Sequence, residues 1–189
     1  MLFPDFLDRE ADEVAERLLG CFLIRDLPEG QVKARIVETE AYDELDPASH
    51  SYSGPSRRSQ VMFGSSGHLY VYFTYGMHYC ANVVCGPAGF GSGVLIRAVE
   101  PVEGVELVAA RRLGVKPPLT TNGPAKLTRA LGIDFDLLGH DLRRSPLRLV
   151  QGDRVEPKEI TKTTRIGISK AVDLERRYYI NSSRYISRR

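Results

Sequence analysis

The segment that most constrains the fold is residues 31–42, which read Gln-Val-Lys-Ala-Arg-Ile-Val-Glu-Thr-Glu-Ala-Tyr. Apolar and basic residues alternate in its first half, which is the period of a half-buried β-strand. If the alternation continues, Glu38, Glu40 and Tyr42 extend the face that carries Ile36. Carboxylates are costly to bury without partners, so we expect this end of the strand to open into a polar cleft. The alternative is an ordinary strand end whose charges face water.

The length of 189 residues fits one domain, residues 1–189, that is large enough for a hydrophobic core. The hydrophobic and charged fractions are ordinary, which is typical of a globular, soluble protein. No apolar run approaches the ~20 residues of a membrane span. No basic region precedes an apolar run near residue 1. We therefore expect neither membrane association nor a signal peptide.

The three cysteines bear on compartment and on metal binding. An odd number argues against a disulfide framework and suits a reducing cytosol. Cys80 and Cys85 lie near His78 and are residue types that bind metals. A single C-x4-C pair without a second pair favours buried strand cysteines instead. The sequence therefore predicts no metal site.

The net charge of +2 hides an asymmetry along the chain. Residues 1–46 contain 13 acidic and 5 basic side chains, whereas residues 158–189 contain 9 basic and 3 acidic ones. Tyr178, Tyr179 and Tyr185 are interleaved in the basic tail. Such a tail could bind a phosphate backbone, and a solvated basic surface is an equally good interpretation.

The expected elements follow from periodicity and turn residues. Asp8 could cap a first helix that carries an apolar stripe and ends at Gly20. A strand over 21–25 and a turn over 27–30 would make residues 31–42 the second strand of a hairpin. Further strands are expected over 69–73, 93–99, 147–150 and 165–169, the last two joined by Gly152-Asp153, and helices over 103–113 and from 122 onward, with Pro124 at the first position.

Two segments favour a functional role. Residues 43–68 form a long polar loop that contains His50, and long loops in compact domains are usually functional or disordered. Residues 69–84 read as a hairpin whose tip is Tyr75-Gly76-Met77. Tyrosines also pack ordinary sheets. Sheet packing explains an aromatic and a methionine at a turn less well than a contact role does. Such side chains could be inserted between stacked bases.

The motifs together resemble the alkyladenine (3-methyladenine) DNA glycosylase family of the mammalian type. The most specific are Val-Glu-Thr-Glu-Ala-Tyr, within residues 36–42, and Leu-Tyr-Val-Tyr-x-x-Tyr-Gly-Met, within residues 69–82. His50, residues 94–104, Gly-Pro-Ala-Lys-Leu from residue 123 and Thr-Arg-Ile-Gly-Ile from residue 164 extend the likeness over nearly the whole chain, in order. The resemblance implies an α+β fold: a single mixed domain with a curved, mostly antiparallel β-sheet and flanking helices.

The resemblance also implies an activity, the hydrolysis of the N-glycosidic bond of a damaged purine that has been flipped out of duplex DNA. Glu40 matches the general base that activates water, and Arg97 matches the arginine that helps to hold that water. Tyr42 would stack on one face of the flipped base, with His50 and Tyr72 on its other side. An arginine within a strand usually has a carboxylate or phosphate partner.

Further roles are implied around the hairpin tip. Tyr75, with Met77 beside it, would fill the gap left in the DNA, and Asn82 would exclude guanine by crowding its amino group. His78 stands among these DNA-binding positions where the family pattern has an aromatic, so minor-groove contacts would differ. The loop around His50 is also built differently from the vertebrate form.

The remaining expectations concern partners and alternatives. Glu38 shares the face of Glu40 and is expected to pair with a neighbouring cation. No metal or organic cofactor is needed, and Lys126, in a helix context, is not expected to act as a nucleophile. We expect a monomer acting on double-stranded DNA, cytoplasmic in a bacterium or nuclear in a eukaryote. The alternatives are a non-catalytic nucleic-acid-binding module and a small-molecule enzyme of related architecture, such as a formyl-group-handling protein.

Overall fold

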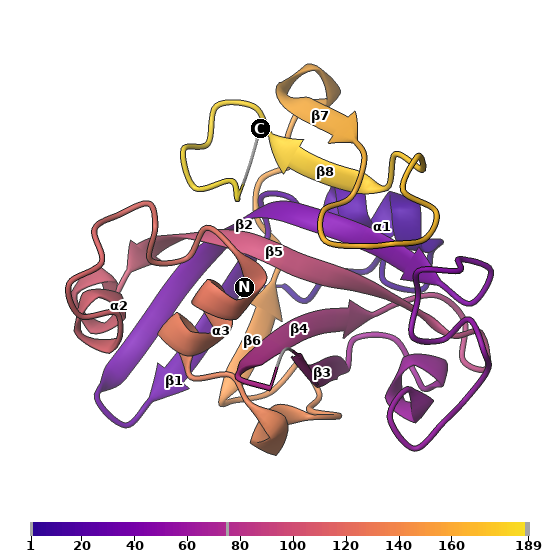
Figure 1. Cartoon of the computed structure of the whole chain (residues 1–189). Coiled ribbons are helices and arrows are strands. Elements are labelled where there is room, and N and C mark those ends of the chain that lie inside the picture. The colour runs from indigo at the N-terminus through magenta and orange to yellow at the C-terminus, as the bar shows by residue number, and fades with distance from the viewer. Residues whose placement is uncertain (1, 75, 188–189) are drawn as a thin grey trace.

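The computed structural model describes residues 2–74 and 76–187 (Figure 1). Within them the chain forms one eight-stranded sheet in the order β3-β4-β5-β2-β1-β6, with β8 added to β2 and β7 to β8. Every pairing is antiparallel, so the expected α+β fold with a mostly antiparallel sheet is confirmed. The strands are β1 (Phe22–Leu27), β2 (Gly30–Asp43), β3 (Leu69–Thr74), β4 (His78–Val84), β5 (Ser92–Glu103), β6 (Leu147–Val150), β7 (Ile160–Thr163) and β8 (Arg177–Ile180).

Strand β2 is the central element of the sheet. Residues 30–35 pair with β1, residues 38–40 pair with β8, and β5 runs alongside almost the whole strand. The β1–β2 hairpin turns between Leu27 and Gly30, as expected from the sequence. Residues 36–41 of β2 are all buried, including the three polar residues Glu38, Thr39 and Glu40, whereas Tyr42 and Asp43 are half-buried.

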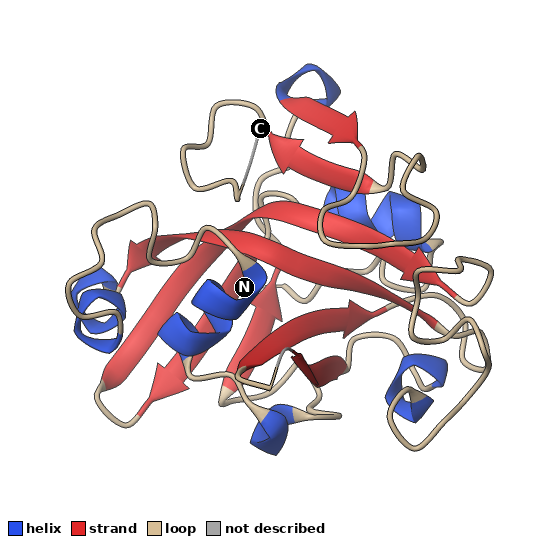
Figure 2. Cartoon of the chain, viewed as in Figure 1, coloured by secondary structure: helices blue, strands red, loops and turns tan. Residues whose placement is uncertain are grey.

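The helices lie around the edges and faces of the sheet (Figure 2). They are α1 (Ala11–Arg17), α2 (Val105–Arg111) and α3 (Pro124–Leu131), with short 3-10 helices at Gln60–Phe63, Phe135–Leu137 and Pro157–Glu159. None of the helices in the described part of the chain is long and apolar enough to cross a bilayer. Helix α3 carries Pro124 in its first turn, as expected, and ends at Gly132 with φ +58°.

Helix α1 confirms the predicted apolar stripe but not the predicted cap. The stripe is buried in the core, and α1 packs on β2, where the Thr39 hydroxyl donates to the Ala15 carbonyl at 2.8 Å. The N-cap position is Glu10, and no side chain caps the helix. Asp8 instead accepts a hydrogen bond from the Ser66 hydroxyl, a tertiary contact that a local pattern cannot reveal. The stripe consists of Ala11, Val14, Ala15, Leu18 and Leu19.

The predicted strand over residues 165–169 is wrong. This segment is irregular, and the strands of the C-terminal region are β7 and β8 instead. Arg165 is buried in an ion pair with Asp46, and the Ile166 amide donates to a side chain rather than to a strand ladder. Gly152 does not form a hairpin turn either; it packs on Gly20, whose carbonyl oxygen would lie 2.0 Å from an added Cβ.

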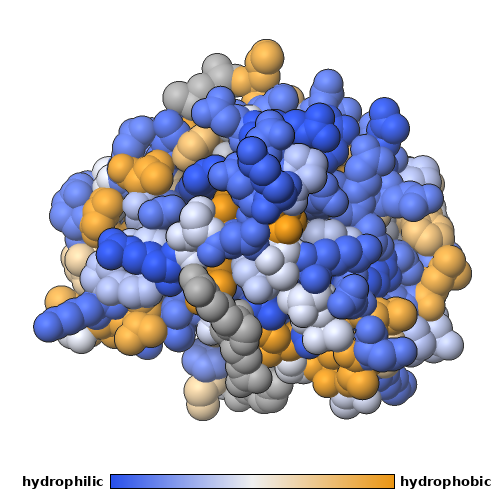
Figure 3. All heavy atoms as spheres, turned by 90° about the horizontal axis from the view of Figure 1, so that it is seen from above, coloured by the Kyte–Doolittle hydropathy of each residue, from blue (hydrophilic) through white to orange (hydrophobic). Residues whose placement is uncertain are grey.

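Basic residues of the C-terminal segment form ion pairs with acidic residues of the N-terminal segment. Arg176 binds Asp12 and Asp43, each at 2.6 Å, and Arg177 binds Glu38 at 2.7 Å. The Tyr178 hydroxyl donates to Asp12 at 2.7 Å and its ring is buried. Arg176 and Arg177 therefore fold onto the acidic segment and are not part of a free basic surface, whereas Lys158, Lys162, Lys170 and Arg184 are exposed, so both sequence interpretations stay open for these four. The face around β7 and β8 is otherwise mostly hydrophilic (Figure 3).

Candidate active site

Two β-bulges bring the charged residues of the central strands together. The aligned pairs of β2 and β5 are Ile36 with Val99, Glu38 with Ala98 and Thr39 with Ile96. Val37 on β2 and Arg97 on β5 are therefore left without an opposite residue. Bulges bend a strand and redirect a side chain, and they are common beside active sites. Here the bulge on β5 places Arg97 against the carboxylates of β2.

Arg97 lies between the two glutamates of β2. Its Nη1 is 3.2 Å from Glu40 Oε1 and its Nε is 3.5 Å from Glu38 Oε1. Glu38 is completely buried and also accepts from Arg177 Nε at 2.7 Å and from the amide and hydroxyl of Ser187 at 2.6 and 2.8 Å. The expectation that Glu38 pairs with a cation is confirmed, and its carboxylate is fully engaged inside the protein.

Glu40 is held differently. Its Oε1 accepts from the Ile166 amide at 2.8 Å and faces Arg97, whereas its Oε2 accepts from the Tyr42 hydroxyl at 2.7 Å. Burial, followed by the negative charge of Glu40, raises the pKa of Tyr42, so its hydroxyl stays protonated and donates. A carboxylate oxygen has two acceptor positions, and Oε2 therefore keeps one position for a further donor.

The expected polar cleft is present where β2 carries Glu40 and Tyr42. It is a cavity of about 530 Å³, within the usual range of ligand pockets. Its floor and walls come from β2, β3, β4 and β5, the loop over 47–50, the start of α3 and the loop over 166–170. Six of the predicted site residues line it: Glu40, Tyr42, His50, Tyr72, Asn82 and Arg97.

One wall of the cavity is an aromatic group built around His50. Its ring meets the Tyr72 ring edge-on, with centroids 4.5 Å apart, and its Nδ1 is 3.0 Å from the Tyr70 hydroxyl. Arg58 Nη2 is 3.4 Å from His50 Nε2, which makes Nε2 the acceptor and Nδ1 the protonated nitrogen. Desolvation, followed by repulsion from Arg58, lowers the pKa of His50 to about 4. The imidazole is therefore neutral near pH 7.

Asn82 and Tyr42 occupy other walls of the cavity. The Asn82 side-chain amide donates to the Tyr70 carbonyl at 3.1 Å, which fixes its orientation on β4. The Tyr42 ring carries the Arg165 guanidinium over one face, 4.6 Å from the ring centroid. The other predicted cavity tyrosine, Tyr72, has a pKa raised by burial and then by Cys80, so it too is a neutral phenol.

Comparison with known proteins decides the family. A model of the family described as methylpurine-DNA glycosylase (MPG) matches residues 5–184. The chain belongs to the methylpurine-DNA glycosylase family. It is 50% identical over 188 residues to a "Putative 3-methyladenine DNA glycosylase" of Methanoculleus marisnigri, with 97% of each chain covered. Proteins of the same name from Carboxydothermus hydrogenoformans and Streptomyces avermitilis are 47% and 45% identical, with 100% and 89% of this chain covered and 100% and 81% of theirs.

The family membership confirms the resemblance seen in the sequence and makes the chain a DNA glycosylase, an enzyme whose substrate is DNA. The remaining predicted residues of this glycosylase lie at the β3–β4 tip. Met77 is 68% exposed and His78 is exposed at the start of β4, outside the cavity lining. Gly76 has φ +66°, which forms the tight turn. Tyr75 lies outside the described residues, so its predicted role stays a prediction.

Sequence reasoning missed the contribution of the loop after Thr164. Ile166 donates its amide to Glu40 and accepts from Arg97 at its carbonyl, 3.4 Å away, and Arg165 covers Tyr42. The motif Thr-Arg-Ile-Gly-Ile did signal this family segment, but its contacts are made by backbone atoms and by a buried arginine. A backbone amide or carbonyl can come from almost any residue type, so these contacts cannot be recognised in the sequence. The residue types of the segment predicted a strand instead.

The candidate metal ligands and the candidate lysine also have definite places. Among the described residues no three His, Cys, Asp or Glu side chains are grouped so as to share a metal ion. Cys80 lines the cavity and Cys85 is buried in the core. Lys126 directs its Nζ to Asn122 Oδ1 at 2.7 Å and is not among the residues that line the cavity.

Proposed function

We propose that this glycosylase flips damaged purines, such as 3-methyladenine and other alkylpurines, out of duplex DNA into the cavity and hydrolyses the N-glycosidic bond. A water activated by Glu40 attacks the sugar and an abasic site remains. The observation that carries the proposal is the unequal use of the Glu40 oxygens: Oε1 is occupied by Ile166 and Arg97, while Oε2 accepts only from Tyr42 among the described residues, and Glu40 is one of the residues that line the cavity. Flipping is the general solution for enzymes that act on a base.

The chemistry requires little more than a positioned carboxylate. Loss of a purine passes through a sugar with oxocarbenium character, as in glycoside hydrolysis. Glu40 orients the water, takes its proton and stabilises the positive charge on the sugar. Arg97 holds the Glu40 carboxylate in place and lies where it can help to hold the water. The scheme requires no metal or organic cofactor.

The leaving base sets the expected order of substrates. Adenine alkylated at N3 in a nucleotide is cationic and leaves without further protonation, whereas hypoxanthine is neutral and gains from a proton. His50, with a pKa of about 4, is neutral at pH 7 and does not supply that proton. We therefore infer that cationic alkylpurines are excised faster than hypoxanthine.

Recognition is assigned to the residues around the cavity. Tyr42 stacks on one face of the flipped base, His50 and Tyr72 contact the other side, and Asn82 excludes guanine. Tyr75 and Met77 fill the space vacated in the duplex. Lys126 donates to Asn122 Oδ1 and lies outside the cavity lining, so the proposal gives it no role as a nucleophile; Lys170 does line the cavity, and the borohydride test below covers it. We propose that the enzyme is monofunctional and that it acts as a monomer.

The test is base release from duplexes that carry either an alkylated adenine or hypoxanthine. The expected products are the free base and an abasic site in an uncut strand, with no protein–DNA adduct trapped by borohydride. Salt-dependent binding without base release would identify a non-catalytic binding module instead. Negligible affinity for duplex DNA would point to a small-molecule enzyme.

A further inference from the structure

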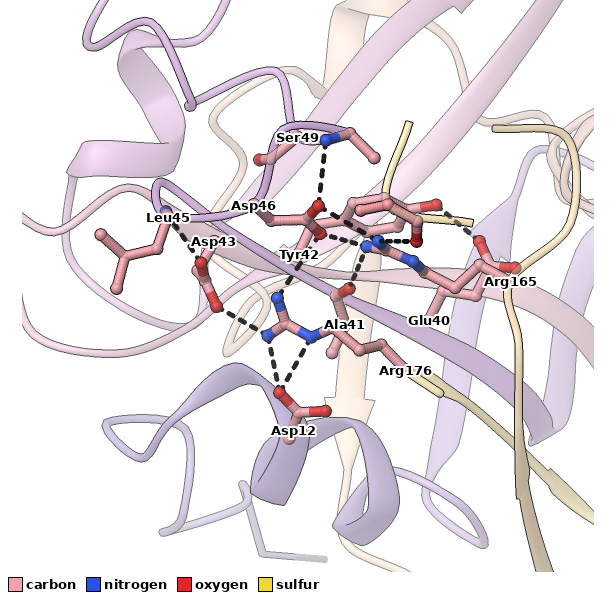
Figure 4. A network of polar contacts seen from close by, with 12 residues as sticks. Asp12, Glu40, Ala41, Tyr42, Asp43, Leu45, Asp46, Ser49, Arg165 and Arg176 are labelled. Carbon is pink, nitrogen blue, oxygen red and sulfur yellow. Dashed lines mark hydrogen bonds and ion pairs between the residues drawn. The ribbon is translucent and has the colours of Figure 1, made fainter. Parts of the chain in front are cut away.

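The contacts of Arg165 extend beyond the cavity it adjoins. Figure 4 shows its guanidinium lying across the Tyr42 ring, with Asp46 and the Ala41 carbonyl among its other partners. Nη1 donates to the Ala41 carbonyl at 3.0 Å and to Asp46, while Nη2 donates to Asp46 at 3.1 Å and to the Ala171 carbonyl at 3.4 Å. The side chains of Arg165 and Asp46 are both fully shielded from solvent. A bidentate, buried pair of this kind fixes the guanidinium plane.

This arrangement fixes the Tyr42 ring from two directions. Its hydroxyl is tied to Glu40 at 2.7 Å, and one ring face is covered by the Arg165 guanidinium at 4.6 Å. The ring also lines the cavity, so a base that enters can stack only on the face not covered by Arg165. The positive charge of Arg165 is paired with the carboxylate of Asp46.

We propose that Arg165, held by Asp46, is a positioning residue that fixes the Tyr42 ring as the stacking surface for the flipped base. The inference rests on the proposed function and deepens it, because it separates two uses of Tyr42. The ring, backed by Arg165, serves base binding, and the hydroxyl, bound to Glu40, serves bond cleavage. Loss of each contact therefore affects a different step.

The variant that tests the proposal is Arg165→Lys. Lysine keeps the charge but has no planar fork with which to span Asp46, the Ala41 carbonyl and the Tyr42 ring together. In single-turnover excision from a lesion duplex, it raises the half-saturating enzyme concentration by about tenfold, the loss expected for part of one base–aromatic stack. The maximal rate changes by less than about threefold, because Glu40, Tyr42 and Ile166 still present the same groups to the water.

Two matched variants keep the result interpretable. Tyr42→Phe keeps the stacking ring and removes the hydroxyl, so it lowers the maximal rate with little change in half-saturation. Arg176→Lys alters an arginine of the same network, which contacts Asp46 at 3.4 Å as well as Asp12 and Asp43, but not the Tyr42 ring (Figure 4). It lowers the melting temperature and leaves half-saturation unchanged.

The same comparison is made without turnover in the Glu40→Gln background. A fluorescent 2-aminopurine beside the lesion reports unstacking, and Arg165→Lys reduces its signal at equal occupancy. The proposal is overturned if Arg176→Lys raises the half-saturating enzyme concentration as much as Arg165→Lys does, because this would indicate a general structural role. It is also overturned if Arg165→Lys lowers only the maximal rate. Absence of base release by the unmodified enzyme would instead defeat the proposed function, and the unstacking measurement would still decide the role of Arg165.

Discussion

Arg97 joins Glu38 to Glu40, with Nε 3.5 Å from one carboxylate and Nη1 3.2 Å from the other. The three side chains are almost completely shielded from solvent. Arg177 supplies a second buried cation beside Glu38, so two carboxylates and two guanidinium groups balance. Only Glu40 of the two carboxylates reaches the cavity. The pair thus divides into a structural glutamate and a glutamate available for chemistry.

The first prediction concerns Glu38→Gln, which removes the charge that holds Arg177 and Arg97. Breaking one partner of a buried ion pair costs about 3–5 kcal/mol. For a domain of this size each kcal/mol lowers the melting temperature by about 2–4 °C. We expect a clear loss of thermal stability, measured by calorimetry, while single-turnover excision at 25 °C slows by less than about tenfold. A rate loss as large as that of Glu40→Gln would show that Glu38 takes part in the chemistry.

The second prediction concerns Tyr75, which lies outside the described residues and whose role is predicted from the sequence. Unstacking a nucleotide costs a few kcal/mol, which an inserted side chain offsets. We expect Tyr75→Ala to weaken binding to a lesion duplex and to slow excision. The same lesion in single-stranded DNA, where no gap opens, loses less activity. Equal losses on the two substrates would remove the insertion role.

The third prediction concerns selectivity at Asn82. Its side-chain amide is fixed by the Tyr70 carbonyl and lines the cavity, where it can crowd the exocyclic amine of guanine. We expect Asn82→Ser to raise the removal of normal guanine relative to hypoxanthine. The two rates are measured on matched duplexes, and an unchanged ratio would place the exclusion elsewhere.

The fourth prediction concerns the titration of His50. Its pKa in the folded protein is about 4, below the ordinary 6.5, so the folded state binds fewer protons than the unfolded state between these values. Stability is therefore lost as pH falls from about 6.5 towards 4, and His50→Gln flattens this part of the profile. Arg58→Ala raises the pKa of His50, seen in an NMR titration, though desolvation keeps it below 6.5. The neighbouring change Arg57→Ala is the control, and an equal rise there would exclude a specific effect of Arg58.

Much of the site follows from sequence because its side chains lie on regular elements. Glu38, Glu40 and Tyr42 alternate on β2, and Glu40 and Tyr42 meet at the cavity as the strand period requires. The β3–β4 hairpin likewise separates Tyr70 and Tyr72 from the core residues Leu69 and Val71. Local periodicity determines these positions.

The parts that sequence did not reveal depend on contacts between distant segments. Arg165 lies 119 residues from Asp46, and the Ile166 amide reaches Glu40 across 126 residues. The bulge at Arg97 is a mismatch of register between two strands, which neither strand shows alone. The position of Asp8 before the helix is typical of a capping residue, yet its side chain accepts a hydrogen bond from Ser66 in another segment. Tertiary pairing decides such cases over local propensity.

The most direct test of the account is single-turnover excision by Glu40→Gln. The amide keeps the shape of the carboxylate and can still accept a hydrogen bond from Tyr42, but it cannot take a proton from water. We predict nearly unchanged affinity for a duplex carrying an alkylated adenine and an excision rate lower by about 100-fold or more, the range for loss of a general base. Excision by Glu40→Gln at close to the normal rate would contradict the mechanism, even though the chain is a glycosylase.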